Sequence, residues 1–225
     1  MSKTDQAYET LKRDILSGAL RPDEALTVAM LTERYGFGWT PLRDSLSRLE
    51  GENLVTLIRN RGYRVTGASL AELQDIQHTR LAIEAQLLRD SIRQGDDDWQ
   101  KHVLLAHRTL SRAPVLATGM SESAYEQFEA AHQEFHLALV GGGSSLWLFR
   151  FLTQIYGQVR RHQRLIVLGR AALSDPMTDA ALLATLHSSS ALEHHTRLMD
   201  ATLDRDEEGA VKLLQEHIGT LPGPE

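Results

Sequence analysis

Four histidines in the second half of the chain have the residue type and spacing of ligands for one metal ion. His132 and His136 lie four residues apart in a segment expected to be helical, so both imidazoles project from one helix face. His195 and His217 lie about 10 and 12 residues from a turn near 204–206, and an antiparallel helix pair brings them level in a bundle. Imidazole is a good ligand for zinc, nickel, copper and iron. The pattern therefore predicts a divalent metal site inside a helical bundle.

Two other interpretations of these histidines stay open at this point. A single His-x3-His pair on a helix is more often surface decoration, and His194-His195 is then a chance doublet. The second alternative is that the histidines form the active site of a metal-dependent enzyme acting on a small carboxylate. Against an enzyme, the sequence contains no His-Glu-x-x-His arrangement and no phosphate-binding glycine loop before a helix.

Three arginines of one predicted helix are candidate ligands for a small acid. Arg160 and Arg164 share one face of the segment 144–169, and Arg161 lies beside them. A guanidinium group binds a carboxylate through two parallel hydrogen bonds. These residues could therefore bind a small dicarboxylate, and a solvated basic helix face is the alternative.

Predicted helices and one hairpin must position these side chains. Residues 1–66 show the order helix, helix, turn, helix and β-hairpin, which is a winged helix-turn-helix. Residues 67–225 are predicted to form an all-helical antiparallel bundle, so the fold class is mainly α. The expected helices of this second domain lie near 70–94, 98–112, 121–140, 144–169, 178–203 and 207–219.

Composition separates the two domains and excludes several classes of protein. The 225 residues include no cysteine, which excludes disulfides, thiolate catalysis and cysteine metal sites. The net charge is −6, but residues 1–66 carry 10 basic and 9 acidic side chains, whereas the remainder carries 14 and 21. That balance is weak for a nucleic-acid binder, so position must support DNA binding. No apolar run is long enough to span a membrane, and the first residues do not resemble a secretory signal. We therefore expect a cytoplasmic protein with no membrane partner.

The third helix of the N-terminal domain has the features of one that enters the DNA major groove. Thr40 is its expected N-cap and Pro41 its first residue, so Arg43 lies in the first turn, within reach of bases and phosphates. The hairpin tip Asn60-Arg61-Gly62 could lie beside the groove as a wing. The alternative is that Arg43 and Arg48 are solvated helix charges.

These motifs together resemble the GntR family of winged-helix regulators. The segments that carry the resemblance are Thr40-Pro41-Leu42-Arg43-Asp44-Ser45-Leu46-Ser47-Arg48-Leu49, Asn53-Leu54-Val55 and Arg61-Gly62-Tyr63-Arg64-Val65. It implies that double-stranded operator DNA is contacted by Trp39, Thr40, Pro41, Arg43, Arg48, Arg61 and Gly62. One departure is Gly38-Trp39, where the family pattern has Ser-Arg with a DNA-contacting arginine. Trp39 either packs on sugar edges or a thymine methyl, or only supports the turn.

The second domain resembles the FCD effector domain of the FadR subgroup. The matching segments are the Arg-x-x-Ile-Glu type helix at 76–84, Phe135-His136, His195 with Ala201, and the helix from Ala210 to His217. The resemblance implies a divalent metal held by the four histidines and a pocket lined by Arg80. The family's acidic ligand is His132 here, and its glutamate before the next histidine is His194. An all-imidazole, neutral site favours zinc or nickel over magnesium or manganese.

One branch of this subgroup is especially similar. The His-Gln-x-Phe-His segment, the Gly-Tyr-Arg-Val wing and Trp99 after an acidic break resemble repressors of glutarate and 2-hydroxyglutarate catabolism genes. The resemblance implies a homodimer on a pseudo-palindromic operator, released when a small dicarboxylate binds the second domain. The alternatives are the metal-dependent enzyme and a helical protein-interaction module without DNA.

Overall fold

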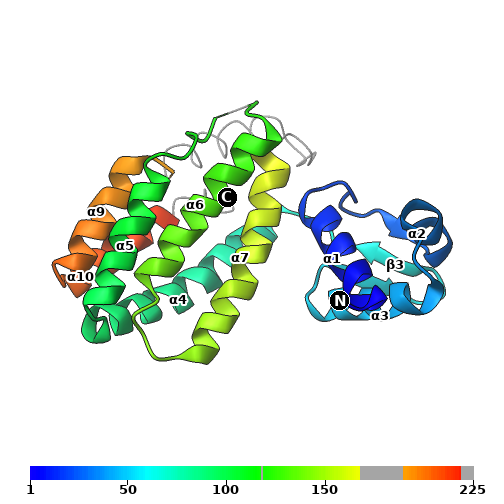
Figure 1. The fold of residues 1–225 in the computed structure, drawn as a ribbon, viewed down its shortest axis with the longest axis horizontal. Helices are drawn as coiled ribbons and strands as arrows, with labels where there is room; N and C mark the ends of the chain where they lie inside the picture. Colours follow the sequence, from blue (N-terminus) through cyan, green and yellow to red (C-terminus); the bar gives the residue numbers. More distant parts are fainter. Residues whose placement is uncertain (118, 168–189, 219–225) are drawn as a thin grey trace.

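The computed structural model describes residues 1–117, 119–167 and 190–218. Figure 1 shows a small domain that contains a sheet beside a larger group of helices, with α7 on the side of the bundle nearest the small domain. Each part has its own hydrophobic core, one formed by residues between 7 and 65 and the other by residues between 73 and 218. The mainly α architecture predicted from the sequence is confirmed.

The small domain contains three helices and an antiparallel sheet. The helices are α1 (Lys3–Leu16), α2 (Val28–Tyr35) and α3 (Trp39–Gly51), and the strands are β1 (Ala25–Leu26), β2 (Val55–Ile58) and β3 (Gly62–Val65). The strand order is β1-β3-β2, and Leu57 pairs with Tyr63 in the hairpin register. The two-residue β1 was not expected from the sequence because it is too short to show an alternating pattern. Side chains from all three helices and from the strands form one hydrophobic core, which fixes the position of α3 in the domain.

The start of α3 differs from the prediction. Thr40 is not the N-cap and Pro41 is not the first helical residue, because the helix begins at Trp39 after Gly38 in extended conformation. Gly38 makes no side-chain cap hydrogen bond, and its carbonyl accepts the first helical bond from the Leu42 amide at 3.2 Å. Pro41 is still within the first turn, where helical amides have no intrahelical partner, so the proline is tolerated there. The correction places Trp39, rather than Thr40, at the head of the helix.

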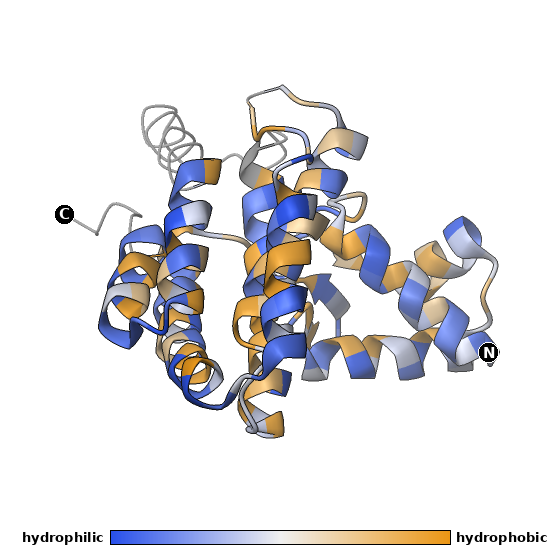
Figure 2. Ribbon diagram, turned by 60° about the vertical axis from the view of Figure 1, so that its left-hand side comes forward, coloured by the Kyte–Doolittle hydropathy of each residue, from blue (hydrophilic) through white to orange (hydrophobic). Residues whose placement is uncertain are grey.

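The larger domain is a bundle whose helices agree closely with the predicted segments. They are α4 (Leu70–Gln94), α5 (Asp97–Leu110), α6 (Glu122–Leu139), α7 (Leu146–Val167), α9 (Leu192–Leu203) and α10 (Glu207–Ile218). Helix α4 packs against α7 and α10, and α5 packs against α6 and α9. The predicted helix 178–203 is seen from 192, and its first part lies outside the described residues. Figure 2 shows the apolar faces of the helices turned toward one another.

Polar caps define where the long helices begin. The side chains of Ser69, Asp96 and Ser121 each accept a hydrogen bond from a backbone amide in the first turn of α4, α5 and α6. Trp99 packs so close to Gly95 that a Cβ there would lie 2.1 Å from the indole. This contact packs the indole tightly against the short connection between α4 and α5. Among the described helices, none has the length and apolar character needed to cross a membrane.

Candidate functional site

The four predicted metal-ligand histidines meet inside the bundle. Helix α6 supplies His132 and His136, α9 supplies His195, and α10 supplies His217. One ligand atom from each of the four lies within 4.8 Å of the others. The cluster is inside the bundle, so the interpretation of these histidines as surface decoration is wrong.

The hydrogen bonds around the cluster leave the Nε2 atoms of three of its histidines without a partner. The Nδ1 of His136 lies 2.7 Å from a carboxylate oxygen of Glu84, and the Nδ1 of His195 lies 2.9 Å from the Ala191 carbonyl. An Nδ1 that donates to an oxygen leaves Nε2 with a lone pair. The Nε2 atoms of His132, His136 and His195 are buried and have no hydrogen-bond partner. Buried polar atoms of this kind are rare unless a metal or water completes them, so the residues present fit a metal ion.

Burial keeps these imidazoles in the neutral form that binds metals. Loss of hydration lowers the pKa of His132 well below its ordinary value, and the neighbouring imidazoles lower it further. The same desolvation lowers the pKa of His195 to about 3. For His136 burial also lowers the pKa, although the carboxylate of Glu84 opposes it. No proton competes with a metal at these three nitrogens near neutral pH.

A buried ion pair supports His136 from behind. Arg80 Nε donates to Glu84 at 2.7 Å, and the Tyr156 hydroxyl donates to the same carboxylate at 3.0 Å. Burial alone would raise the pKa of Glu84, but Arg80 and then His136 outweigh it and hold the value at about 2. Glu84 is therefore an anion that orients the His136 ring. Its position four residues after Arg80 was visible in the sequence, whereas no sequence signal pointed to Tyr156.

The predicted effector-binding arginines are already paired with acidic residues. Arg80 is buried against Glu84. Arg160 lies 3.0 Å from a Glu129 oxygen, and Arg164 pairs with Glu122 and Glu126. Arg160 and Arg164 thus both face α6, and their four-residue spacing had predicted only that they share one face of their own helix. Their assignment to an effector stays a prediction, and a bound dicarboxylate would have to compete with these glutamates.

The candidate DNA-contacting residues fall into two groups. Arg43 and Thr40 are exposed on α3, and the Arg43 guanidinium carbon lies 4.6 Å from the centre of the Trp39 ring. Arg61 is exposed at the hairpin tip. Arg48 instead stacks 3.8 Å from the centre of the Tyr8 ring and pairs with an acidic residue of α1 at 3.2 Å. Arg48 is thus held against the domain's own surface.

The wing depends on a glycine at its tip. Gly62 has φ +83°, a left-handed conformation that favours glycine, and a Cβ there would approach the Leu26 carbonyl oxygen to 3.2 Å. The turn is closed by a hydrogen bond of 2.9 Å from the Arg61 amide to the Ile58 carbonyl. The tip can thus lie close to β1 and present Arg61 outward. Pro41, in the first turn of α3, is only partly buried on the same domain.

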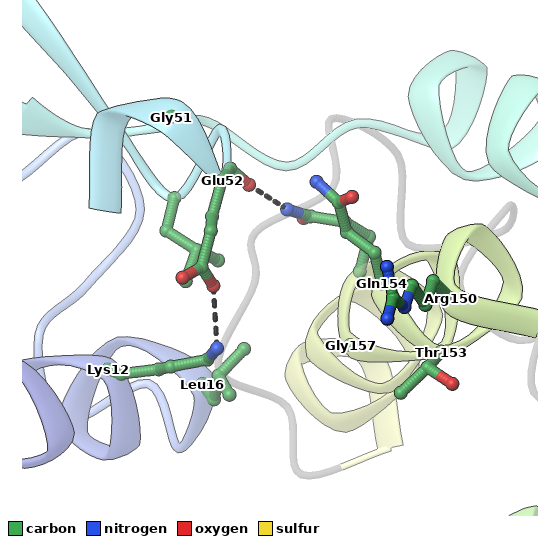
Figure 3. Close-up of a pocket in the computed structure, with 10 residues that line it drawn as sticks. Lys12, Leu16, Gly51, Glu52, Arg150, Thr153, Gln154 and Gly157 are labelled. Carbon is green, nitrogen blue, oxygen red and sulfur yellow. Dashed lines mark hydrogen bonds and ion pairs between the residues drawn. The ribbon is translucent and has the colours of Figure 1, made fainter. Parts of the chain in front are cut away.

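Helix α7 of the bundle makes hydrogen bonds to the small domain and to the segment that links the two domains. Gln158 donates to the Glu52 carbonyl at 2.9 Å, and Arg161 donates to the carbonyls of Thr66 and Gly67 in the linker. Burial lowers the pKa of the Arg161 side chain. Beside these contacts a cavity of about 480 Å³ lies between α1, the end of α3 and α7, with a Lys12–Glu52 ion pair on its wall (Figure 3). The sequence did not indicate these interdomain contacts.

Family models match both domains of the chain. The model described as "Bacterial regulatory proteins, gntR family" matches residues 3–65, and the FCD domain model matches residues 75–220. The HTH-type transcriptional repressor GlaR of Escherichia coli (strain K12) is 37% identical over 95% of this chain and 91% of its own length. The uncharacterized HTH-type transcriptional regulator BphR of Paraburkholderia xenovorans is 31% identical, over 96% and 82%. These proteins are regulators, so the comparisons do not support the enzyme alternative.

Solved structures share the fold. E. coli McbR/YncC superposes with a TM-score of 0.68 at 22% identity, covering 97% of this chain and 94% of that one. A putative GntR regulator from Rhodococcus sp. RHA1 gives a TM-score of 0.69 at 17% identity, with coverage of 97% and 95%. An N-terminal winged helix followed by an FCD bundle is thus supported by the geometry and by both kinds of comparison. The chain belongs to the GntR family of bacterial regulatory proteins, with an FCD effector domain, and is a DNA-binding transcription regulator.

Proposed function

We propose that this regulator is a homodimeric repressor, that its second domain holds a divalent metal, and that a small dicarboxylate releases it from its operator. The observation that carries the proposal is the set of three buried histidine nitrogens without partners in the bundle. Similarity to a relative named as a repressor supports the sign of regulation. A regulator of this kind must reach the chromosome, so we place its action in the cytoplasm.

Zinc or nickel suits the donor set best. His132, His136, His195 and His217 would hold the ion, because four neutral imidazoles favour these metals over harder cations. When bound, the metal supplies a Lewis-acidic centre for an effector carboxylate or hydroxyl. Glu84 and Arg80 carry opposite charges beside the cluster, so the surroundings add no net charge. The positive charge of the bound metal would then attract the negatively charged effector.

Glutarate or 2-hydroxyglutarate is the effector class we propose, on the resemblance of the His-Gln-x-Phe-His and wing segments to one branch of the subgroup. Arg80 can bind one carboxylate only if it exchanges part of its contact with Glu84 or Tyr156. Arg160 and Arg164 would likewise have to leave their glutamates on α6. Effector binding would therefore rearrange ion pairs on α4, α6 and α7.

Helix α7 is the element that could carry this change to the DNA-binding domain. Tyr156 faces the Glu84–Arg80 pair, whereas Gln158 lies on the opposite side of the helix and bonds to Glu52. Arg161 shares that outer side and holds the linker carbonyls. A shift of α7 that follows Tyr156 would move both outer contacts together. An effector that binds the shifted arrangement better would lower operator affinity by the same coupling free energy.

The DNA-facing residues would act as a pair of modules in the dimer. Thr40, Pro41 and Arg43 would enter the major groove, and Arg61 and Gly62 would contact the backbone beside it. Two copies related by a two-fold axis would bind two half-sites of a pseudo-palindrome. Nothing in this arrangement requires a strongly basic domain, because the contacts depend on position.

The test measures operator release together with metal content. Operator fragments are selected from a random DNA library, and binding is followed by fluorescence anisotropy at one salt concentration. We expect glutarate or 2-hydroxyglutarate to weaken binding by about 5- to 150-fold, the usual range of coupling. Chelation should abolish the response, and zinc or nickel should restore it.

The matched control separates the cluster from histidines in general. A His136→Ala, His195→Ala double variant should lose the metal measured by mass spectrometry and the effector response. His102→Ala alters an exposed histidine outside the cluster and should lose neither. If no dicarboxylate of about four to six carbons changed operator affinity or melting temperature in the metal-loaded protein, the effector assignment would be wrong.

A further inference from the structure

Trp39 is a large apolar residue left in solvent at the head of the proposed recognition helix. Its side chain is 59% exposed. It is absent from the side chains that form or pack against the hydrophobic core in the described part of the small domain. The interpretation that Trp39 only supports the turn is therefore not favoured by its packing. An exposed indole at the first residue of α3 needs another explanation.

Arg43 lies one turn later and covers one face of this indole. The guanidinium carbon is 4.6 Å from the ring centroid, within the range of a cation–π contact. A cation–π contact of this kind uses none of the N–H hydrogen-bond donors of the guanidinium. No ion pair involving Arg43 is found among residues 1–117, 119–167 and 190–218. The contact thus restricts the arginine side chain and still leaves its donors for a partner.

The two side chains offer complementary chemistry to adjacent bases. Guanine presents two acceptors, O6 and N7, in the major groove, and arginine bonds to both at once. Thymine presents a methyl group there, which favours apolar contact. A guanidinium held on an indole therefore places a guanine-reading group and an apolar surface side by side.

From this geometry we infer that Trp39 and Arg43 act as one unit that recognises a guanine next to a thymine in each operator half-site. Trp39 contacts the thymine methyl and also positions Arg43 on the guanine. The inference rests on the proposed entry of α3 into the major groove. It assigns base specificity to the position where the family pattern has arginine and this chain has tryptophan.

A matched pair exists elsewhere in the same protein. Trp147 at the start of α7 is 66% exposed, and the Arg150 guanidinium carbon lies 5.2 Å from its ring centroid. The residue types, exposure and stacking resemble those of Trp39 and Arg43, but this pair is in the bundle. Trp147→Ala therefore controls for the loss of an exposed, arginine-stacked tryptophan.

The experiment uses modified bases that remove one group at a time. In the selected operator, each thymine beside a guanine is replaced by deoxyuridine, which lacks only the methyl, and each guanine by 7-deazaguanine, which lacks N7. Wild-type protein should lose about fourfold in affinity for each deoxyuridine, the value of one buried methyl group, and so about 16-fold when both half-sites carry one. It should lose about tenfold on the adjacent 7-deazaguanine.

The variants assign each loss to a residue. Trp39→Ala should bind the unmodified operator at least about tenfold more weakly and should no longer distinguish thymine from deoxyuridine. Arg43→Ala should become insensitive to 7-deazaguanine, and the double variant should lose less than the sum of the two singles because they act as a unit. Trp147→Ala should behave as wild type with every probe.

Each contrary result has a distinct meaning. If Trp39→Ala keeps the wild-type response to deoxyuridine, or if the two single losses add fully, the inference is overturned. If the operator binds and discriminates as expected but no dicarboxylate releases it, the proposed effector function fails and the inference stands. Circular dichroism of each variant verifies that α3 is intact, and the exposed position of Trp39 makes misfolding of Trp39→Ala unexpected.

Discussion

Two sets of arginines, one in each domain, differ in whether their partners belong to the protein. In the bundle, Arg80, Arg160 and Arg164 each pair with a glutamate on α4 or α6. In the small domain, Arg43 and Arg61 are exposed, and the described residues give neither of them an ion pair. The three bundle arginines are neutralised by the protein's own carboxylates, whereas Arg43 and Arg61 remain available to a polyanion.

This difference explains why net charge is a poor guide to function here. A bundle that balances arginine with glutamate can hold a buried metal cluster without excess charge. A DNA-binding surface needs only a few unpaired cations at the right positions, since each phosphate contact releases counterions. The near-neutral balance of residues 1–66 is thus compatible with DNA binding.

The largest effect should follow from breaking the internal balance at Glu84. Glu84→Gln keeps the shape of the side chain but leaves Arg80 buried without a counter-charge, which we expect to lower the free energy of unfolding by about 3–5 kcal/mol. Urea denaturation measures the loss. The control is Arg93→Gln, which removes the largely exposed pair with Glu207 and should lower the free energy of unfolding far less, because solvent screens that pair. Equal losses for the two variants would show that the buried pair is not special.

A second variant shows whether charge, rather than shape, causes that loss. Replacing both partners, in Arg80→Met with Glu84→Gln, removes the unpaired cation and should recover much of the stability. The double variant should nevertheless bind metal more weakly, because His136 loses the anion that orients its ring.

The sequence predicted the elements well because their signals are local. Helices α4 and α6 begin within a residue of the predicted starts, and the spacing of His132, His136, His195 and His217 was sufficient to place the cluster in a bundle. Contacts between distant residues carry no such signal. Tyr156 lies 72 residues from Glu84, and nothing in its neighbours distinguishes it from a core tyrosine. Gln158 and Arg161 bond to backbone carbonyls, which any sequence presents, so the interdomain contacts were unpredictable.

The start of α3 was mispredicted for a different physical reason. Thr40 followed by Pro41 has the residue types of a cap and a first helical residue, and the sequence signal was therefore reasonable. Gly38 competes with Thr40 because it adopts the extended cap conformation and lets the helix begin one residue after it. The helix then includes Trp39, which is why the stacked pair with Arg43 at four-residue spacing could form.

An intermediate effect should come from acidifying the metal-free protein. The pKa of His195 is lowered by burial to about 3 in the folded state and is near 6.5 when unfolded. The unfolded state therefore binds this proton more tightly, and stability falls as the pH drops below about 6.5. Between pH 7 and pH 5 the protonation of this histidine in the unfolded state should lower the free energy of unfolding by about 2 kcal/mol. Urea titrations with chelator present measure the change.

Two histidine variants isolate that contribution. His195→Gln should make the decline with falling pH less steep, because one of the buried histidines that take up a proton on unfolding is gone, while His132 and His136 remain. His78→Gln, at an exposed position on α4, is the matched control for the substitution itself. Parallel curves for wild type and His195→Gln would mean that the cluster is not the source of the acid sensitivity.

The smallest expected effect is on the salt dependence of operator binding, and it should distinguish an unpaired arginine of the small domain from a paired one. Arg61→Ala should weaken operator binding modestly and reduce the slope of log affinity against log salt by about 1, the loss of one phosphate contact. Arg48→Ala is the matched control. Its guanidinium is stacked on Tyr8 and paired with Asp5, so the salt slope should stay the same and only stability should fall slightly. Should Arg48→Ala lower the salt slope as much as Arg61→Ala, Arg48 must leave α1 for the DNA. The paired arginines of the small domain would then be as available to the polyanion as the unpaired ones.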